Sequence, residues 1–236
     1  MQAVILAGGK GTRLAPYTRV LPKPLMPICD MPILEVLLRQ MKRAGVSEAV
    51  LTVGYLDGLL RSYFGDGRRL GLRIRYSHET CPLGTVGPLA LIEGLEDTFL
   101  VSNGDVLTTL DPASLFAFHR RLGGIATIAI HQRRVPIHHG VLRSGEDARI
   151  TAYEEKPVLE YSASMGMYVF ERRVLEYIPA RQRLDLPDLI NRLLAAGEKV
   201  AGYPFDGYWQ DLGNPADYRQ ATQDFERMRP QFLGDD

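Results

Sequence analysis

Short apolar runs alternate with apolar residues at helical spacing along most of this chain. Runs typical of buried strands lie at residues 3–6, 49–53, 72–76, 99–101 and 126–130. After the first run, apolar side chains recur every three or four positions over residues 33–44, which predicts a helix, and Gly45 favours its C-terminal end there. Strands that alternate with helices are typical of α/β folds with a parallel sheet.

Two Asx-Pro pairs indicate further helix starts. Asp111-Pro112 predicts a helix that runs to about residue 122, and Asn214-Pro215 predicts a last helix over roughly residues 216–228. In each pair the first side chain can accept backbone N–H bonds at the N-cap, and proline suits the first helical position. Residues 140–171 are less regular and contain short strand-like pieces.

Length, charge and cysteine content narrow the class of protein. With 236 residues and no Pro-, Gly- or Ser-rich linker, the chain is expected to form one domain over residues 1–236. The 28 basic and 28 acidic residues balance, so no global field favours nucleic acid or an anionic membrane as a partner. Two cysteines do not make a disulfide framework, and Met1 leads directly into the first strand, so a cytoplasmic protein is expected.

A glycine-rich stretch follows the first strand, and two familiar phosphate loops do not fit it. Residues 7–14 read Ala-Gly-Gly-Lys-Gly-Thr-Arg-Leu. A Walker loop requires Ser or Thr after Gly-Lys, but Gly11 follows Lys10. A dinucleotide-binding loop that starts at Gly9 would need its third glycine at Leu14, where the bulk of leucine disfavours a helix packed closely on the strand.

Two cations accompany these glycines. Arg13 lies inside the stretch, and Lys23 stands between Pro22 and Pro24. Glycines allow backbone N–H groups to approach phosphate oxygens, and Arg and Lys supply the positive charge that those oxygens require. The sequence therefore predicts a polyphosphate site after the first strand. A plain strand-to-loop turn would explain the glycines but not the two cations.

The same stretch and five later motifs resemble the signature of sugar-1-phosphate nucleotidylyltransferases. The motifs occur in that family's order, namely residues 8–14 with Pro22-Lys23-Pro24, then Pro82-Leu83-Gly84-Thr85, Asn103-Gly104-Asp105, Glu155-Lys156-Pro157, Gly166-Met167-Tyr168 and Trp209-Gln210-Asp211-Leu212-Gly213. The resemblance spans nearly the whole chain and points to the catalytic part of GDP-mannose pyrophosphorylase, chiefly through residues 77–79 and 82–91.

The resemblance implies a fold and a division of labour. The expected fold is a Rossmann-like three-layer α/β sandwich with a mostly parallel central sheet and a small sugar-binding subregion. About residues 1–110 are expected to bind the nucleotide, and about residues 111–236 to bind the sugar phosphate and supply a closing helix.

The implied reaction is attack by a sugar 1-phosphate oxygen on the α-phosphate of a nucleoside triphosphate, which releases pyrophosphate. Both reactants are anions and the attacking oxygen is already deprotonated, so charge neutralisation and in-line positioning matter more than a general base. Arg13 is expected to hold the β- and γ-phosphates, and Lys23 to neutralise the α-phosphate and the sugar phosphate. Asp105 and Asp211 are expected to hold Mg²⁺, which suits two carboxylates together with phosphate oxygens and water.

The other implied contacts divide between the two substrates. Nucleotide-binding residues are expected to be Leu6, Ala7, Gly8, Gly9, Gly11, Thr12, Arg13, Glu79, Pro82, Leu83, Gly84, Thr85, Asn103, Gly104 and Asp105. Sugar-phosphate-binding residues are expected to be Gly140, Glu155, Lys156, Ser164, Gly166 and Trp209. Gly84 is expected to meet the nucleobase. Taken alone, Asp105 also fits a turn cap, and Gly166 a strand bulge.

One departure from the resembled family bears on the substrates. Ser164 stands where the mannose branch typically has Asn, and serine is shorter. Together with the absence of a C-terminal β-helix, this points away from mannose itself and toward heptose or a similar sugar. The expected substrates are GTP and a mannose- or heptose-type sugar 1-phosphate, with CTP, UTP, ATP or dTTP and another sugar as alternatives. A non-catalytic relative that binds nucleotide sugar is the alternative outside the enzymes, although Arg13, Lys23 and both Asp residues are present. A homo-oligomer also stays open.

Overall fold

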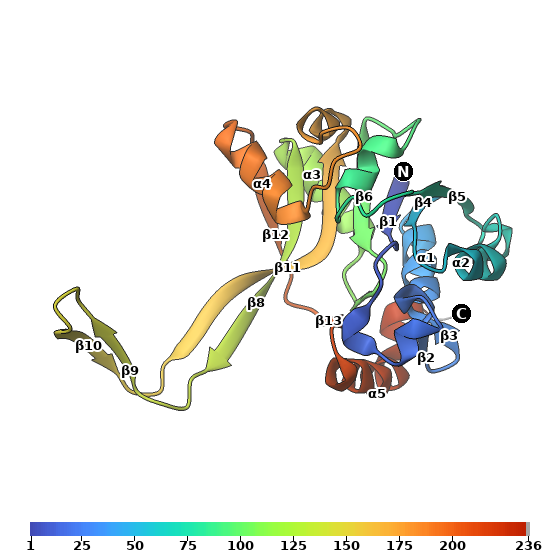
Figure 1. Cartoon of the computed structure of the whole chain (residues 1–236). Coiled ribbons are helices and arrows are strands. Elements are labelled where there is room, and N and C mark those ends of the chain that lie inside the picture. Colours follow the sequence, from blue (N-terminus) through green and yellow to red (C-terminus); the bar gives the residue numbers. More distant parts are fainter. Residues whose placement is uncertain (235–236) are drawn as a thin grey trace.

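A seven-stranded sheet forms the centre of the molecule, with its strands in the order β12-β8-β11-β6-β1-β4-β5 (Figure 1). The computed structural model describes residues 1–234. The strands are β1 (Gln2–Leu6), β4 (Glu48–Val53), β5 (Arg73–His78), β6 (Thr98–Asn103), β8 (Ala126–Pro136), β11 (Val158–Glu171) and β12 (Val200–Pro204). Neighbouring strands are parallel except where β11 pairs with β6 and β8. The mostly parallel sheet confirms the expected fold class.

Helices cover both faces of this sheet, because apolar side chains of the central strands point to both faces. In β1, Ala3 and Ile5 join one apolar layer and Val4 joins the other, because successive strand residues point to opposite faces. The first layer is covered by α1 (Ile33–Arg43), α2 (Asp57–Phe64) and α3 (Pro112–Leu122). The second is covered by α4 (Leu186–Ala195) and the 3-10 helices η5 (Gly87–Leu91) and η6 (Arg172–Tyr177).

The predicted helices form where their start signals stand. The Asp111 side chain accepts the backbone N–H of Ala113 at 3.0 Å and of Ser114 at 3.2 Å, which caps α3. The Asn214 side chain caps α5 (Pro215–Leu233) in the same way. The prediction ended this helix at Met228, and the backbone is indeed non-helical there, but a further turn follows the kink.

Helix α5 packs outside the first layer and joins the end of the chain to its beginning. Phe225 and Phe232 are fully buried against Ile28 and Ile33. Ile28 belongs to β2 (Pro27–Ile28), which pairs with β3 (Met31–Pro32) in a separate two-stranded sheet. The last helix therefore holds the segment that follows the glycine-rich loop.

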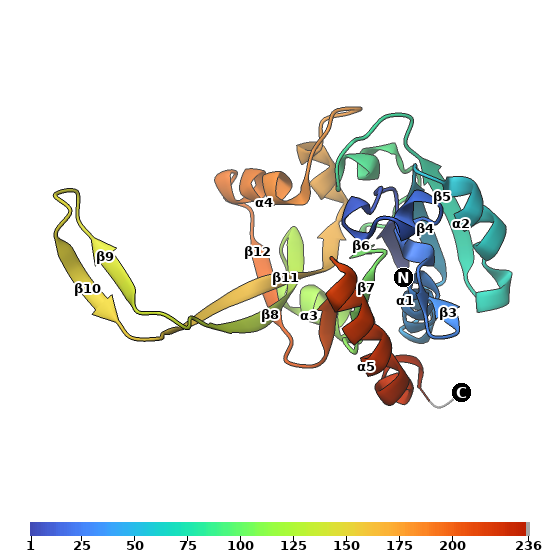
Figure 2. The ribbon, with the colours of Figure 1, turned by 60° about the horizontal axis from the view of Figure 1, so that its bottom comes forward.

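A long β arm, here residues 131–163, projects from the sheet (Figures 1 and 2). The antiparallel pair of β8 and β11 continues away from the body, and a second hairpin of β9 (Val141–Ser144) and β10 (Ile150–Glu154) extends it. The sequence predicted strand-like pieces here. The structure shows instead that residues 158–171 form one continuous strand.

The arm has one polar and one apolar face near its base. On the polar face Arg134 and Glu160 form an ion pair at 2.8 Å. On the other face Val135, Leu159 and Tyr161 are 43%, 53% and 45% exposed. Among the described residues, the arm contributes no member to the three buried apolar clusters.

Candidate active site

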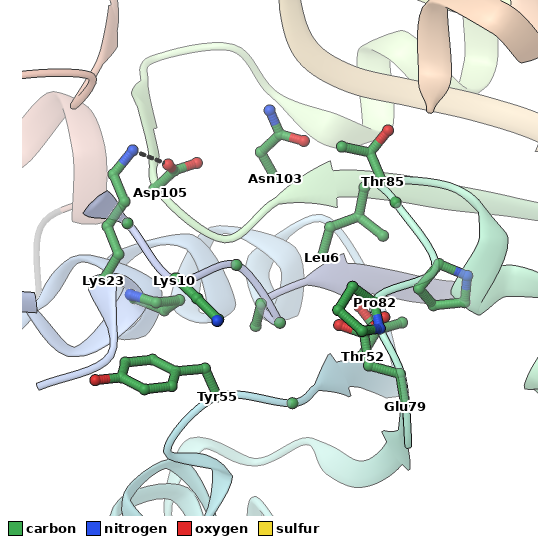
Figure 3. Close-up of a pocket in the computed structure, with 18 of the residues that line it drawn as sticks. Leu6, Lys10, Lys23, Thr52, Tyr55, Glu79, Pro82, Thr85, Asn103 and Asp105 are labelled. Carbon is green, nitrogen blue, oxygen red and sulfur yellow. Dashed lines mark ion pairs between the residues drawn. The ribbon is translucent and has the colours of Figure 1, made fainter. Parts of the chain in front are cut away.

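A cleft of about 690 Å³ opens at the carboxyl ends of the central parallel strands (Figure 3). Open α/β sheets bind ligands at this edge. Its wall is formed by the loops that follow β1, β4, β5 and β6. The predicted site residues that line it are Leu6, Ala7, Gly8, Gly9, Gly11, Thr12, Arg13, Lys23, Glu79, Pro82, Gly84, Thr85, Asn103 and Asp105.

The glycine-rich loop is folded so that Arg13 lines the cleft. The carbonyl oxygen of Gly11 accepts the Leu14 N–H at 2.9 Å and the Thr18 hydroxyl at 2.8 Å. Leu14 is 1% exposed, so its side chain fixes the loop to the body. A Cβ built on Gly213 would lie 3.4 Å from Arg13 Nη1, which places the guanidinium beside the turn that follows β13 (Trp209–Asp211).

Lys23 stands at the cationic end of the cleft and faces two carboxylates. It begins the 3-10 helix η3 (Lys23–Leu25), in which Pro22 occupies the N-cap and Pro24 follows. The Lys23 ammonium forms an ion pair with Asp105, drawn in Figure 3, and its Nζ lies 4.0 Å from Asp211 Oδ1. Because the Lys23 side chain is only 12% exposed, this charge is held rather than mobile.

Strand pairing brings the two aspartates together although 106 positions separate them in sequence order. Asp105 follows β6, and β7 (Val106–Thr108) begins at the next residue. Strand β13 is antiparallel to β7, with Asp211 opposite Val106. The expectation that Asp105 and Asp211 meet therefore agrees with the backbone geometry, and each of them faces Lys23.

Burial is the main cause that raises the pKa of Asp211, and the nearby Asp105 carboxylate raises it further. Lys23 and Arg13 act in the opposite direction. Repulsion between two carboxylates favours any cation placed between them. Oxygen donors of this kind suit Mg²⁺, which takes one or two carboxylates and keeps sites for phosphate and water. Within residues 1–234 no group of three or more His, Cys, Asp or Glu side chains suits a metal, so this pair fits only an ion that keeps other ligands.

The opposite end of the cleft carries a different set of groups. Figure 3 shows Glu79, Pro82 and Thr85 at the far side from Lys23 and Asp105. Glu79 Oε2 accepts the Leu83 backbone N–H at 3.1 Å. This bond orders the turn between β5 and the loop that carries the predicted nucleobase contacts.

A loop from the second half of the chain completes this end, and the sequence analysis did not predict it. Arg183 and Asp185 line the cleft. Asp185 Oδ1 accepts the Thr85 N–H at 3.0 Å, and Thr85 Oγ1 accepts the Leu186 N–H at 2.6 Å. Each residue thus satisfies a backbone group of the other's loop, and Thr85 caps the start of α4 in place of the N-cap residue Asp185 itself. The one sequence signal here is Asp185 before Leu186-Pro187, which is typical of a helix start.

Gly84 is required by this loop contact. Its φ is +79°, and a Cβ there would lie 2.5 Å from the Leu184 carbonyl oxygen and 2.7 Å from Asp185 Oδ1. Close approach of the two loops, together with the left-handed backbone, is a sufficient reason for glycine. Its predicted nucleobase contact stays a prediction.

Three of the predicted sugar residues, on β11 and β13, do not line the cleft. Gly166 has φ +77°, and a Cβ there would lie 2.6 Å from Asn103 Nδ2, so β11 passes directly behind the cleft residue Asn103. The Ser164 hydroxyl lies 3.0 Å from the Tyr168 hydroxyl. Trp209 donates its indole N–H to the Met165 carbonyl at 3.0 Å.

The other three predicted sugar residues lie on the arm, outside the cleft. Gly140, Glu155 and Lys156 are exposed, and Glu155 and Lys156 form an ion pair at 3.7 Å. The Tyr153 hydroxyl donates to Glu155 and would lie 2.5 Å from a Cβ on Gly140. The structure thus groups these residues with one another, and their role toward a sugar stays a prediction.

Curated enzymes that act on sugar 1-phosphates resemble this chain in sequence. A mannose-1-phosphate guanylyltransferase from Mycobacterium tuberculosis is 38% identical over 235 residues, which cover 96% of this chain and 65% of the relative. A UTP–glucose-1-phosphate uridylyltransferase from a Synechocystis species is 37% identical over 94% of this chain and 63% of its own length. The chain therefore spans slightly less than two thirds of the length of these curated relatives.

Solved structures share the fold. A putative glucose-1-phosphate thymidylyltransferase from Bacillus anthracis superposes with a TM-score of 0.77 at 25% identity, and 94% of each chain is covered. HddC from Yersinia pseudotuberculosis gives a TM-score of 0.74 at 24% identity, with 95% of this chain and 99% of HddC covered.

Two further findings bear on the class of protein. Among the described residues no helix is both long and apolar enough to cross a membrane. The nucleotidyl transferase family matches residues 2–228, almost the full length. With the cleft, its cations and its paired aspartates in place, this match confirms the resemblance noted in the sequence, and the chain belongs to the nucleotidyl transferase family.

Proposed function

We propose that this protein transfers a nucleotidyl group from a nucleoside triphosphate, most favourably GTP, to a sugar 1-phosphate and releases pyrophosphate. The observation that carries the proposal is the cationic end of the cleft, where Arg13 and Lys23 meet Asp105 and Asp211. Two anions that repel each other can react only where such charge is fixed in advance.

The residues divide the work by position. Arg13, on the glycine-rich loop, stabilises the charge that develops on the leaving pyrophosphate. Lys23 neutralises the α-phosphate and the incoming sugar phosphate, and its carboxylate partners keep the ammonium in place until substrate arrives. The attacking phosphate oxygen carries no proton at neutral pH, so no side chain has to act as a general base.

Asp105 and Asp211 would hold Mg²⁺. When bound, this ion would supply positive charge that offsets the repulsion between the two anionic substrates. The contribution of the chain is the spacing of the two carboxylates, which the pairing of β7 with β13 fixes.

The choice of GTP and of a mannose- or heptose-type sugar is drawn from the relatives and the resembled motifs. The relative from M. tuberculosis is named a guanylyltransferase of mannose 1-phosphate, whereas others are named for UTP or for a thymidylyl group. CTP, UTP, ATP or dTTP with another sugar 1-phosphate is therefore the second candidate.

The test measures pyrophosphate release with five nucleoside triphosphates, several hexose and heptose 1-phosphates, and Mg²⁺. We expect turnover that depends on a sugar 1-phosphate and is fastest with GTP. Asp105→Asn should remove turnover while the melting temperature stays close to that of the parent protein. Absence of turnover with every substrate pair would leave a nucleotide-sugar-binding protein as the remaining function.

A further inference from the structure

The two ends of the cleft differ chemically, as do the two ends of a nucleotide, which carry the phosphates and the base. The end with Arg13 and Lys23 suits a polyphosphate. The other end is lined by Glu79, Pro82 and Thr85 and by Arg183, whose guanidinium pairs with Asp185. On the proposed function, on which this inference rests, the base therefore lies beside Arg183.

We infer that Arg183 selects guanine by donating two parallel N–H bonds to the O6 and N7 atoms of the base. A guanidinium carries five N–H donors in a rigid fork. One of them is used on Asp185, since Arg183 Nη2 lies 3.0 Å from Asp185 Oδ2. The remaining donors match a pair of adjacent acceptors, and of the two purines only guanine presents such a pair, at O6 and N7.

The loop holds Arg183 in position, which distinguishes it from an ordinary surface arginine. Leu184, the next residue, is 3% exposed, and its N–H donates to the Leu83 carbonyl at 2.9 Å. Its carbonyl accepts the Val86 N–H at 3.1 Å and the Gly87 N–H at 3.2 Å. The backbone on the C-terminal side of Arg183 is therefore fixed to the loop of residues 83–87, and Asp185 accepts a hydrogen bond from the side chain.

Other bases fit this group less well. Adenine presents an amino group where guanine presents O6, so one donor of Arg183 would face another donor. Uracil and thymine place an N–H donor between their two carbonyl oxygens, so they present no two adjacent acceptors. Cytosine does present such a pair, at O2 and N3, so CTP is titrated beside ATP and should bind less tightly than GTP. Because the Arg183 side chain is 70% exposed, its truncation should change the stability of the nucleotide-free protein little.

The test compares the binding of GTP and ATP by isothermal titration calorimetry in the presence of Mg²⁺. The parent protein should bind GTP more tightly than ATP, and Arg183→Ala should reduce this ratio by about ten- to a hundred-fold, the usual value of one bidentate Arg–guanine contact. Arg183→Lys keeps the charge without the fork, so it should lose nearly as much preference.

Arg181→Ala is the matched control, because Arg181 is an exposed arginine two positions earlier that does not line the cleft. It should keep the parent ratio of GTP to ATP affinity. Equal affinity of the parent protein for both nucleotides, or an unchanged ratio in Arg183→Ala, overturns the inference. Selective GTP binding without pyrophosphate release would instead contradict the proposed reaction and leave this inference intact.

Discussion

Arg13 and Arg19 lie six residues apart on one segment but in different surroundings. Both arginines are exposed, but Arg13 lines the cleft beside the turn at Gly213, whereas Arg19 does not line it and its carbonyl accepts the Tyr55 hydroxyl at 3.0 Å. Loss of one fixed donor to transition-state charge typically lowers kcat by about 100- to 1000-fold. We expect that loss for Arg13→Ala in a steady-state pyrophosphate assay. Arg19→Ala should stay within about three-fold of the parent, as surface changes usually do, and equal losses in both variants would refute the role of Arg13.

Gly84 and Gly94 provide a second matched pair. Both have positive φ, +79° and +70°, but a Cβ on Gly94 would meet nothing within 4 Å. Gly94→Ala should therefore show only backbone strain, about 1 kcal/mol of unfolding free energy. Gly84→Ala adds a clash with the Leu184 carbonyl and should lose about 2–4 kcal/mol in urea denaturation. Similar losses of unfolding free energy in the two variants would mean that the loops around Gly84 can move apart to accept a Cβ at little cost.

The sequence predicted those candidate site residues that lie within short motifs. Arg13 and Lys23 were predicted from the glycine-rich stretch, and Asp105 and Asp211 from the resemblance to a family. The structure brings Lys23, Asp105 and Asp211 together, and their roles stay predictions. Arg183 and Asp185 were not predicted, because their loop has no motif of its own and reaches the cleft through bonds of Asp185 and Leu186 to Thr85, a hundred positions earlier.

At the scale of elements, the arm differs from every other pair of strands. A two-stranded ribbon is at best marginally stable by itself, and this one packs no side chain into the buried clusters of the described chain. Backbone amides of β9 and β10 should therefore exchange with solvent far faster than those of β1 and β6, by at least about 100-fold in native-state hydrogen exchange by mass spectrometry. Slow exchange in β9 and β10 would contradict this, and would mean that their exposed side chains Leu142 and Ile150 are covered in solution.

The same elements explain which part of the fold was predictable. The helix at Asp111 and the kinked helix at Asn214 follow from caps, and the parallel strands follow from apolar runs. The reach of the arm did not follow, since half-exposed apolar residues alternate with charges in the same way on a ribbon and on the rim of a sheet.

For the molecule as a whole, ligand binding and stability should be linked through the cleft. At a concentration of GTP about 100 times its dissociation constant, the native state gains about 2.7 kcal/mol. For a chain of this size that corresponds to a rise in Tm of about 5–10 °C. Differential scanning fluorimetry should show this rise with GTP and Mg²⁺. Asp105→Asn should lose the part that depends on Mg²⁺.

Asp147→Asn is the control for that measurement, because Asp147 pairs with Arg149 on the arm. Its response to GTP and Mg²⁺ should equal that of the parent protein. An undiminished Mg²⁺ effect in Asp105→Asn would place the ion elsewhere.

The reciprocal bonds between Thr85 and Asp185 have a consequence for how the protein is made. The glycine-rich loop leaves the ribosome early. The other end of the cleft cannot form until residues 182–186 have been made, and Asp211 follows later still. Contacts between such distant segments form late in folding because a large loop must close first. During synthesis the nascent chain should therefore form the glycine-rich loop long before the other end of the cleft, and affinity for nucleotide should appear only after residues 182–211 have been made.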